Sequence, residues 1–198
     1  LGLRYLDTGA MFRAMTWWML QHGVDVHDPA AVAARVAEPD LVSGTDPLAP
    51  AITVDGTDVA VAIRGDDVNA AVSPVSAVPE VRARLLEMQR AVIARESATG
   101  IVVEGRDIGS VVVPDAPVKV YLSADPAARA ARRSAEQGGG DVDATRESLL
   151  ARDRIDSGRA TAPLTMADGA VHIDTTGHTL AEVIALVVSL VEDAGART

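Results

Sequence analysis

The segment from residue 102 to residue 117 constrains the fold more than any other part of the chain. A continuous apolar run ends there in a cluster of opposite charges set between glycines, namely Glu104, Gly105, Arg106, Asp107 and Gly109. Such an apolar run is typical of a strand buried in a parallel sheet. Ligands of α/β proteins bind where such strands end. The segment therefore predicts an α/β fold with a ligand site at the carboxyl edge of its sheet.

Two other segments repeat this combination of glycine and charge. Residues 7–13 read Asp-Thr-Gly-Ala-Met-Phe-Arg, and residues 152–159 read Arg-Asp-Arg-Ile-Asp-Ser-Gly-Arg. The three clusters together contain five arginines, of which four are the candidate phosphate ligands: Arg13, Arg106, Arg152 and Arg159. A guanidinium is planar and can hold two phosphate oxygens at once. A lone arginine is more often half of a surface ion pair. Three clusters at strand ends or in glycine-rich segments instead favour a site for a small phosphorylated ligand.

Hydrophobic periodicity gives the order of the remaining elements. The predicted strands are 3–6, 101–103, 118–122 and 171–174, and the predicted helices are about 10–21, from 29 onward, 66–72, 79–97, 126–136, 142–157 and 180–192. Residues 40–66 lose the helical pattern, and residues 51–54 and 58–63 flank Asp55-Gly56 as a hairpin. This order predicts a doubly wound parallel sheet with helices on both faces and a small antiparallel β insertion.

Composition narrows the class of protein. The 198 residues suit one domain, residues 1–198, and the absence of cysteine excludes disulfides, thiolate metal sites and a thiol nucleophile. The four histidines have no metal-ligand spacing, so no metal site is predicted. No apolar run approaches 18 residues and Leu1 begins no signal peptide, which leads us to expect a soluble, cytoplasmic protein without a membrane partner.

The charge balance points to small anionic substrates rather than nucleic acid. The net charge is −10, which argues against binding to nucleic acid or to an anionic membrane. Every basic residue except Lys119 is an arginine, and seven arginines fall between residues 129 and 159. Local positive charge on an acidic protein is what a small phosphorylated substrate needs.

The Asp7-Thr8-Gly9 motif also raises the alternative of an aspartic protease. That chemistry needs two carboxylates sharing a proton, in an all-β fold. Here a helical pattern follows the motif at once, and the nearest second candidate, residues 173–176, lacks the glycine. The sequence therefore disfavours this alternative.

Taken together, the three clusters resemble the bacterial cytidylate kinase family of nucleoside monophosphate kinases. The matching stretches are residues 6–13, 103–109 and 152–164, supported by residues 173–175 and by the insertion, so the likeness runs through nearly the whole chain. The resemblance implies a P-loop kinase-like fold with a CMP-binding insertion at 40–75. It also implies a helical lid at 129–157, in which Gly138–Gly140 would form the flexible turn.

The resemblance implies transfer of the γ-phosphoryl group of ATP, with Mg²⁺, to CMP or dCMP, giving CDP or dCDP and ADP. The acceptor oxygen is already anionic at neutral pH, so positioning and charge neutralisation carry the catalysis. By similarity the catalytic residues are Arg13, Arg106, Arg152 and Arg159, with Asp7 and Thr8 beside them. Asp156 would bind the ribose hydroxyls, and Arg129, Arg132 and Arg133 would serve ATP.

Three further positions match those that contact the base in this family: Ser73, Arg82 and Asp107. Cytosine carries an amino donor where uracil carries a carbonyl, so an acceptor pair of Ser73 and Asp107 would favour cytosine. Arg82 would donate to the ring acceptors. Glu104 would contact the magnesium shell or orient Arg106.

The sequence also departs from the family pattern. The glycine-rich phosphate loop, Gly-x4-Gly-Lys-Ser/Thr, does not occur, and in the family it comes just before the segment that begins at Leu1. We therefore expect the printed sequence to begin part-way through a monomeric protein. Glu104 replaces a more common Asp and Phe12 a more common Tyr. Two alternatives stay open: a related kinase for UMP or AMP, and a catalytically silent nucleotide-binding protein.

Overall fold

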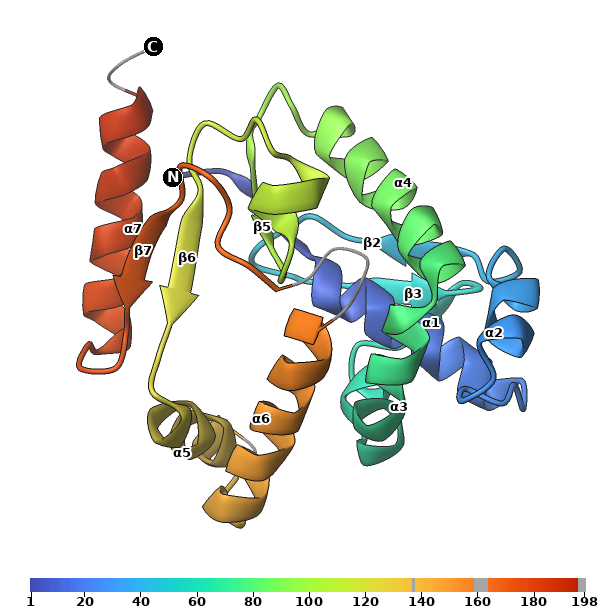
Figure 1. Ribbon diagram of the computed structural model, residues 1–198. Coiled ribbons are helices and arrows are strands. Elements are labelled where there is room, and N and C mark those ends of the chain that lie inside the picture. The colour runs from blue at the N-terminus through green and yellow to red at the C-terminus, as the bar shows by residue number, and fades with distance from the viewer. Residues whose placement is uncertain (137, 159–163, 196–198) are drawn as a thin grey trace. The chain divides into compact units, whose positions relative to one another are not determined.

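The computed structural model describes residues 1–136, 138–158 and 164–195. The chain forms two compact units, unit 1 (Leu1–Ile108) and unit 2 (Gly109–Thr198). Figure 1 shows α-helices together with paired parallel strands, and an α/β fold is therefore confirmed. The short helical turn η2 (Ile108–Val112) lies where the chain passes from one unit to the other.

Unit 1 combines one parallel strand pair with the β insertion and four helices of the described chain. Its elements are β1 (Arg4–Asp7), α1 (Thr8–Gln21), α2 (Pro29–Arg35), β2 (Leu41–Ser43), β3 (Ile52–Val54), β4 (Thr57–Asp58), η1 (Ala62–Arg64), α3 (Asp66–Ala77), α4 (Pro79–Arg95) and β5 (Ile101–Glu104). Strands β1 and β5 pair in parallel, with Arg4 opposite Ile101 and Asp7 opposite Glu104. The two acidic residues thus stand side by side at the carboxyl ends of the strands.

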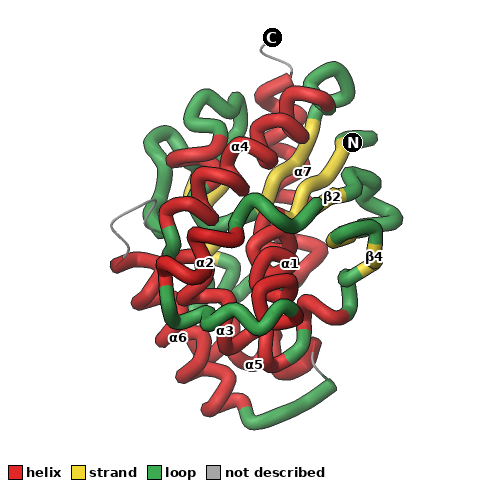
Figure 2. The backbone as a smooth tube through the Cα atoms, turned by 90° about the vertical axis from the view of Figure 1, so that its right-hand side faces the viewer, coloured by secondary structure: helices red, strands yellow, loops and turns green. Residues whose placement is uncertain are grey.

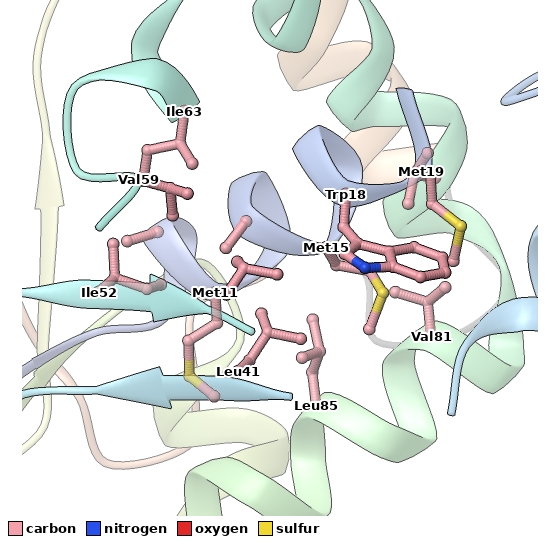
Figure 3. Packing of buried hydrophobic residues seen from close by; sticks show 14 of the residues in the cluster. Met11, Met15, Trp18, Met19, Leu41, Ile52, Val59, Ile63, Val81 and Leu85 are labelled. Carbon is pink, nitrogen blue, oxygen red and sulfur yellow. The ribbon is translucent and has the colours of Figure 1, made fainter. Parts of the chain in front are cut away.

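Helix α1 is the centre of the unit 1 core. The apolar side chains of Met11, Met15, Trp18 and Met19 recur at helical spacing, and all four are buried. They meet side chains from the β insertion, such as Ile52, and from α4, such as Leu85 (Figure 3). A helix surrounded by partners in this way gains most of its stability from tertiary packing.

The β insertion is tied to α1 at its turn. Asp55 has a left-handed backbone (φ +51°) and precedes Gly56 (φ +76°), as an Asp-Gly hairpin turn requires. The Asp55 carboxylate accepts a hydrogen bond from Trp18 Nε1 at 2.8 Å and another from the Asp40 backbone at 2.9 Å. The Trp18 ring also stacks on His22, with 3.9 Å between ring centroids, and lies near the Arg35 guanidinium.

Unit 2 contains a second parallel strand pair and three helices in its described part. Its elements are β6 (Val120–Ser123), α5 (Pro126–Glu136), α6 (Val142–Gly158), β7 (Val171–Asp174) and α7 (Leu180–Gly195). Strands β6 and β7 pair with Val120 opposite Val171. Helices α5 and α6 pack against each other. None of the described helices is long and apolar enough to cross a membrane.

The element order predicted from sequence is confirmed, and several boundaries were wrong. The strand expected at 58–63 is only Thr57–Asp58, because the chain then turns into η1; Figure 2 shows the insertion as mostly loop around β2 and β4. Helix α3 runs through Pro74 to Ala77 instead of stopping at residue 72. Lys119 lies before β6, not within a strand, and its Nζ donates to the Pro114 carbonyl at 3.0 Å.

Candidate active site

The end of β1 and the end of β5 are joined by side-chain hydrogen bonds. Asp7 caps α1, and its Oδ1 accepts from the Ala10 backbone at 2.9 Å. The buried Thr8 hydroxyl donates to the Glu104 carbonyl at 2.7 Å. A side chain at Gly105 would collide with Thr8 Oγ1, so only glycine lets the two segments approach this closely. These residues meet at the start of helix α1, where backbone N–H groups favour anions.

Burial and neighbouring charges shift the pKa of the Glu104 carboxyl group at the end of β5. Loss of hydration raises its pKa, and repulsion from Asp7 adds to that effect, while a hydrogen bond from Tyr5 and the charge of Arg64 oppose it. Burial and the same hydrogen bond to Glu104 raise the pKa of the Tyr5 hydroxyl. The Glu104 carboxylate therefore accepts from Tyr5 beside a second negative charge, and it is suited to contact with cations.

Arg13, a predicted phosphate ligand, extends from the second turn of α1 toward the start of α3. Its Nη1 donates to Asn69 Oδ1 at 2.6 Å and to the Ile63 carbonyl at 3.2 Å. Both acceptors are neutral groups, and they hold this side of the guanidinium in place. Arg106 is half-buried and follows Gly105 directly, which places it next to the contact between Thr8 and Glu104.

Arg82 and Asp107 form a buried ion pair, although they lie on separate segments of unit 1. Arg82 Nη2 donates to Asp107 Oδ2, and only about a tenth of either side chain is exposed. The Arg82 guanidinium also lies 5.4 Å from the centre of the Phe12 ring and donates to the Ser76 carbonyl at 3.3 Å. Its Nε is buried and has no hydrogen-bond partner among the residues that the structure describes. A buried donor without a partner favours a ligand acceptor in this place.

Ser73, the third predicted base contact, lies on α3 and is half-buried. Its carbonyl accepts from the Ser76 hydroxyl at 3.1 Å, and the Ser76 carbonyl in turn accepts from Arg82. The three predicted base-contacting residues are therefore linked within unit 1 by a short chain of hydrogen bonds.

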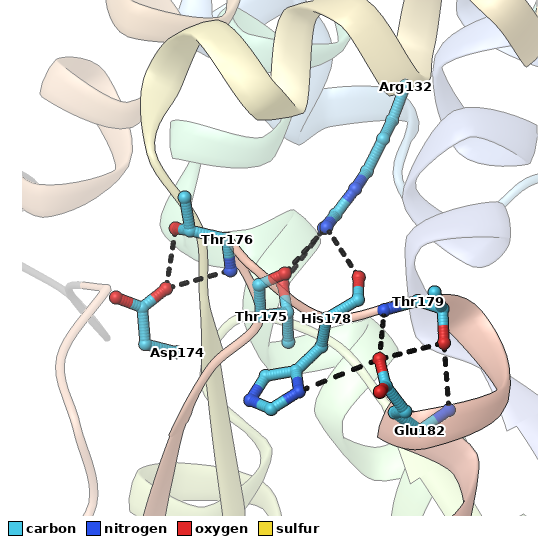
Figure 4. Close-up of polar contacts among 7 residues, drawn as sticks. All are labelled: Arg132, Asp174, Thr175, Thr176, His178, Thr179 and Glu182. Atoms are coloured by element: carbon cyan, nitrogen blue, oxygen red, sulfur yellow. Dashed lines mark hydrogen bonds and ion pairs between the residues drawn. The ribbon is translucent and has the colours of Figure 1, made fainter.

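The arginines predicted to serve ATP lie on α5 in unit 2, and each has a partner in its own unit. Arg129 Nη1 pairs with Asp153 of α6 at 2.5 Å, and Arg133 pairs with Glu136 at 3.3 Å. Arg132 crosses to the loop between β7 and α7, where it donates to Thr175 Oγ1, to the Thr175 carbonyl and to the His178 carbonyl (Figure 4). A nucleotide that used these arginines would have to share or replace these contacts.

The remaining predicted site residues are described only in part. Arg152 and Asp156 belong to α6, but their side chains fall outside the described part of the structure, as does the whole of Arg159. Among the described residues, no group of three or more His, Cys, Asp or Glu side chains is placed to hold a metal ion.

Sequence reasoning missed two side chains that support this site, Tyr5 and Asn69. Each contacts a predicted site residue through the folded chain: Tyr5 contacts Glu104, and Asn69 contacts Arg13. A signal for Tyr5 existed, because it lies two residues before Asp7 and so shares a face of β1 with that residue. For Asn69 the sequence offers no local signal, since it lies 56 residues from its partner.

Comparisons with known proteins identify the family of this chain. The family model described as cytidylate kinase matches residues 1–193. A cytidylate kinase of Streptomyces avermitilis is 59% identical over 193 residues, covering 98% of this chain and 83% of that protein. Cytidylate kinases of Nocardia farcinica and Mycobacterium leprae are 52% and 44% identical, covering 93% and 97% of this chain and 80% and 85% of those proteins. This chain therefore belongs to the cytidylate kinase family of enzymes.

Proposed function

We propose that the protein transfers the γ-phosphoryl group of MgATP to CMP or dCMP, and that the buried Arg82–Asp107 pair selects the base. This pair is the observation that carries the proposal. A charge pair removed from water costs free energy to desolvate, and hydrophobic residues of similar size often replace such a pair without loss of stability. Its presence beside Phe12, with an unpartnered Arg82 Nε, supports a role in ligand recognition.

Cytosine and uracil differ in hydrogen-bond polarity at one edge of the ring. The Asp107 carboxylate accepts hydrogen bonds, and it would meet an amino donor in cytosine but a carbonyl oxygen in uracil. Two acceptors facing each other away from water are unfavourable, because neither oxygen finds a donor. Ser73 would complete the acceptor pair, and Arg82 would donate to the ring acceptors.

The phosphoryl transfer needs no general base, because the attacking oxygen of the acceptor phosphate is already anionic at neutral pH. Catalysis then rests on alignment and on neutralising the charge of the phosphates. We assign this role to Arg13, Arg106, Arg152 and Arg159. Thr8 and Asp7 would lie beside these arginines at the start of α1. Asp156 would bind the ribose hydroxyls.

Arg129, Arg132 and Arg133 are assigned to ATP, in exchange for their contacts within unit 2. Magnesium is held in such reactions mainly by the nucleotide's phosphate oxygens, with one or two carboxylates from the protein. Asp7 and Glu104, adjacent at the strand ends, are the carboxylates of unit 1 that fit this need. Magnesium would neutralise charge on the transferring phosphates.

The finer organisation completes the proposal. Residues 40–75 would be the CMP-binding insertion. Residues 129–157 would be a lid in which Gly138–Gly140 form the flexible turn. The parallel strand pairs would belong to a doubly wound sheet of the P-loop kinase type. The protein would act as a cytoplasmic monomer.

The proposal is tested first on the full-length protein with MgATP and CMP, UMP or AMP in parallel. Turnover with CMP far above that with UMP and AMP is expected. Preference for UMP or AMP would instead favour a related kinase, and absence of turnover with all three would favour a silent nucleotide-binding protein.

The role of Asp107 is tested by its substitutions. Asp107→Ala is expected to narrow the CMP-over-UMP ratio of kcat/KM by roughly tenfold or more, because the carboxylate no longer opposes the uracil carbonyl. Asp107→Asn, which adds an amide donor in nearly the same shape, should narrow the ratio at least as much. The ratio is measured within one protein sample, so partial unfolding does not change it. An unchanged ratio in both variants would remove Asp107 from base reading.

A further inference from the structure

Three segments of unit 1 contact the Arg82 guanidinium. Its Nη1 donates to the Ser76 carbonyl of α3 at 3.3 Å, and its Nη2 donates to Asp107 in the segment after β5. The guanidinium also lies over the ring of Phe12 on α1, with 5.4 Å between Arg82 Cζ and the ring centre. Phe12 is half-buried and packs against the core of unit 1. Hydrogen bonds therefore hold the edge of the guanidinium, and an aromatic ring covers its face.

The contact with Phe12 holds Arg82 without using its hydrogen-bond donors. A cation over an aromatic face is attracted by the ring electrons and needs no N–H group for this contact. A carbonyl or carboxylate in the same place would instead take up one of the donors. The Arg82 Nε is buried and has no hydrogen-bond partner in the described part of the chain. An acceptor on a ligand would satisfy it.

The position of the Arg82 donors matters for the choice of base. Cytosine and uracil differ at ring nitrogen N3, because N3 accepts a hydrogen bond in cytosine and carries a hydrogen in uracil. A guanidinium only donates, so it can pair with N3 of cytosine and opposes the N3–H group of uracil. Two donors that face each other away from water are unfavourable, since neither finds an acceptor. The discrimination therefore depends on how firmly Arg82 is held.

We infer that Phe12 is a positioning residue for base recognition: its ring fixes the plane of the Arg82 guanidinium, so that the donors of Arg82 meet the base in a constant geometry. The inference rests on the proposed function, in which Arg82 and Asp107 read the base. It gives α1 a role in base selection through Phe12. This role needs an aromatic ring at position 12 and not merely an apolar side chain.

The experiment measures kcat/KM of the full-length protein for CMP and for UMP, with MgATP held constant, and compares the ratio of the two values. Phe12→Leu removes the aromatic face and keeps an apolar side chain against the core, whereas Phe12→Tyr keeps the face. The control is Trp17→Leu, because it removes another half-buried aromatic ring with which α1 packs against the same core.

Phe12→Leu is expected to lower the CMP-over-UMP ratio roughly threefold to tenfold, which is the effect of losing a cation–π contact that is removed from water. Phe12→Tyr and Trp17→Leu should each keep the ratio within about twofold of the wild type. A merely structural role of Phe12 would lower kcat/KM for both nucleotides by the same factor. The unchanged ratio would then overturn the inference, as would an equal loss of the ratio in Phe12→Tyr.

Arg82→Gln separates this inference from the proposed function, because glutamine keeps a donor for Asp107 but lacks the guanidinium. If Arg82→Gln lowers the ratio and Phe12→Leu does not, the role of Phe12 is wrong and the base contact of Arg82 stands. If neither variant lowers the ratio, the base contact itself is wrong, and the role of Phe12 fails with it. If Phe12→Leu alone lowers the ratio, Phe12 does not act through Arg82. If Trp17→Leu lowers it as much, the effect reflects a loosened α1. Either of these last two results also overturns the inference.

Discussion

Unit 1 and unit 2 are stabilised in different ways. In unit 1, α1 is surrounded by buried apolar side chains of the insertion, α3 and α4, including fully buried Val75 and Leu85. In unit 2, the buried apolar residues of the described part are Val112, Ala130 and Ile173, and α7 buries none of its described residues. Its helices are instead connected through charged and polar contacts such as Arg129–Asp153 and Arg132–Thr175.

The difference matches the tasks that we propose for the two units. A base-selecting pair must be held in fixed geometry to distinguish one polar group, and dense packing supplies that rigidity. Arginines that serve a nucleotide must exchange partners when it binds and leaves. An ion pair that is partly open to solvent, such as Arg129–Asp153, is desolvated less than a buried pair, so its partners are exchanged at a smaller cost in free energy.

The largest expected effect concerns two ion pairs of different burial. Asp107→Asn should lower the free energy of unfolding of unit 1 by about 3–5 kcal/mol, because it leaves the Arg82 charge buried and uncompensated. Asp153→Asn, which removes the carboxylate facing the more exposed Arg129, should cost about 1 kcal/mol or less. Urea denaturation measures both, with tryptophan fluorescence for unit 1, which contains both tryptophans, and circular dichroism for the helices of both units together. An equal loss of unfolding free energy in the two variants would contradict the prediction that the buried ion pair contributes more to stability.

A second pair of variants makes the same comparison with apolar side chains. Leu85→Ala on α4 should destabilise the protein by roughly 2–5 kcal/mol, since it opens a cavity at a fully buried position. Leu180→Ala on α7, where 77% of the residue is exposed, should change stability by less than about 0.5 kcal/mol. A large loss in the α7 variant would mean that unit 2 depends on apolar burial as unit 1 does.

The smallest effect appears at alkaline pH. The pKa of Tyr5 in the folded protein lies above its value near 10 in an unfolded chain. The unfolded chain therefore loses this proton first, so the stability that Tyr5 contributes is present below about pH 10 and declines as the pH rises above it. Tyr5→Phe should lose less stability than the wild type between about pH 9 and 11 in denaturation experiments. Tyr121→Phe, the same substitution in unit 2, controls for loss of a hydroxyl; equal pH profiles of wild type and Tyr5→Phe would contradict the prediction.

The sequence predicts an element correctly where residues at its ends mark clear limits. Helix α5 and strand β7 have the predicted limits, because Pro126 begins the helix and a short apolar run defines the strand. Strand β2 was not predicted, because its three residues lack the adjoining hairpin turn that Asp55-Gly56 gives to β3, a strand of equal length. Helix α3 was predicted too short because proline usually ends a helix, whereas the tertiary contacts of Val75 continue it through Pro74.

The candidate site was predictable as a set of residues but not as a set of contacts. Motifs identified Arg82 and Asp107 separately, and their ion pair joins positions 25 residues apart that no spacing rule connects. The contact between Arg13 and Asn69 is equally invisible in the sequence, because it depends on how α1 packs against α3. Patterns therefore name chemical groups, and packing decides which of them meet.

The contact between the hairpin turn and α1 also makes the fluorescence of Trp18 sensitive to the position of the β insertion. Trp18 donates its indole N–H to Asp55 and stacks on His22, so its emission depends on whether the β insertion is seated on α1. Release of Asp55 would change the polarity around the indole without unfolding α1. With Trp17 replaced by Phe, so that Trp18 is the remaining tryptophan, fluorescence can thus follow movement of the insertion while nucleotides bind.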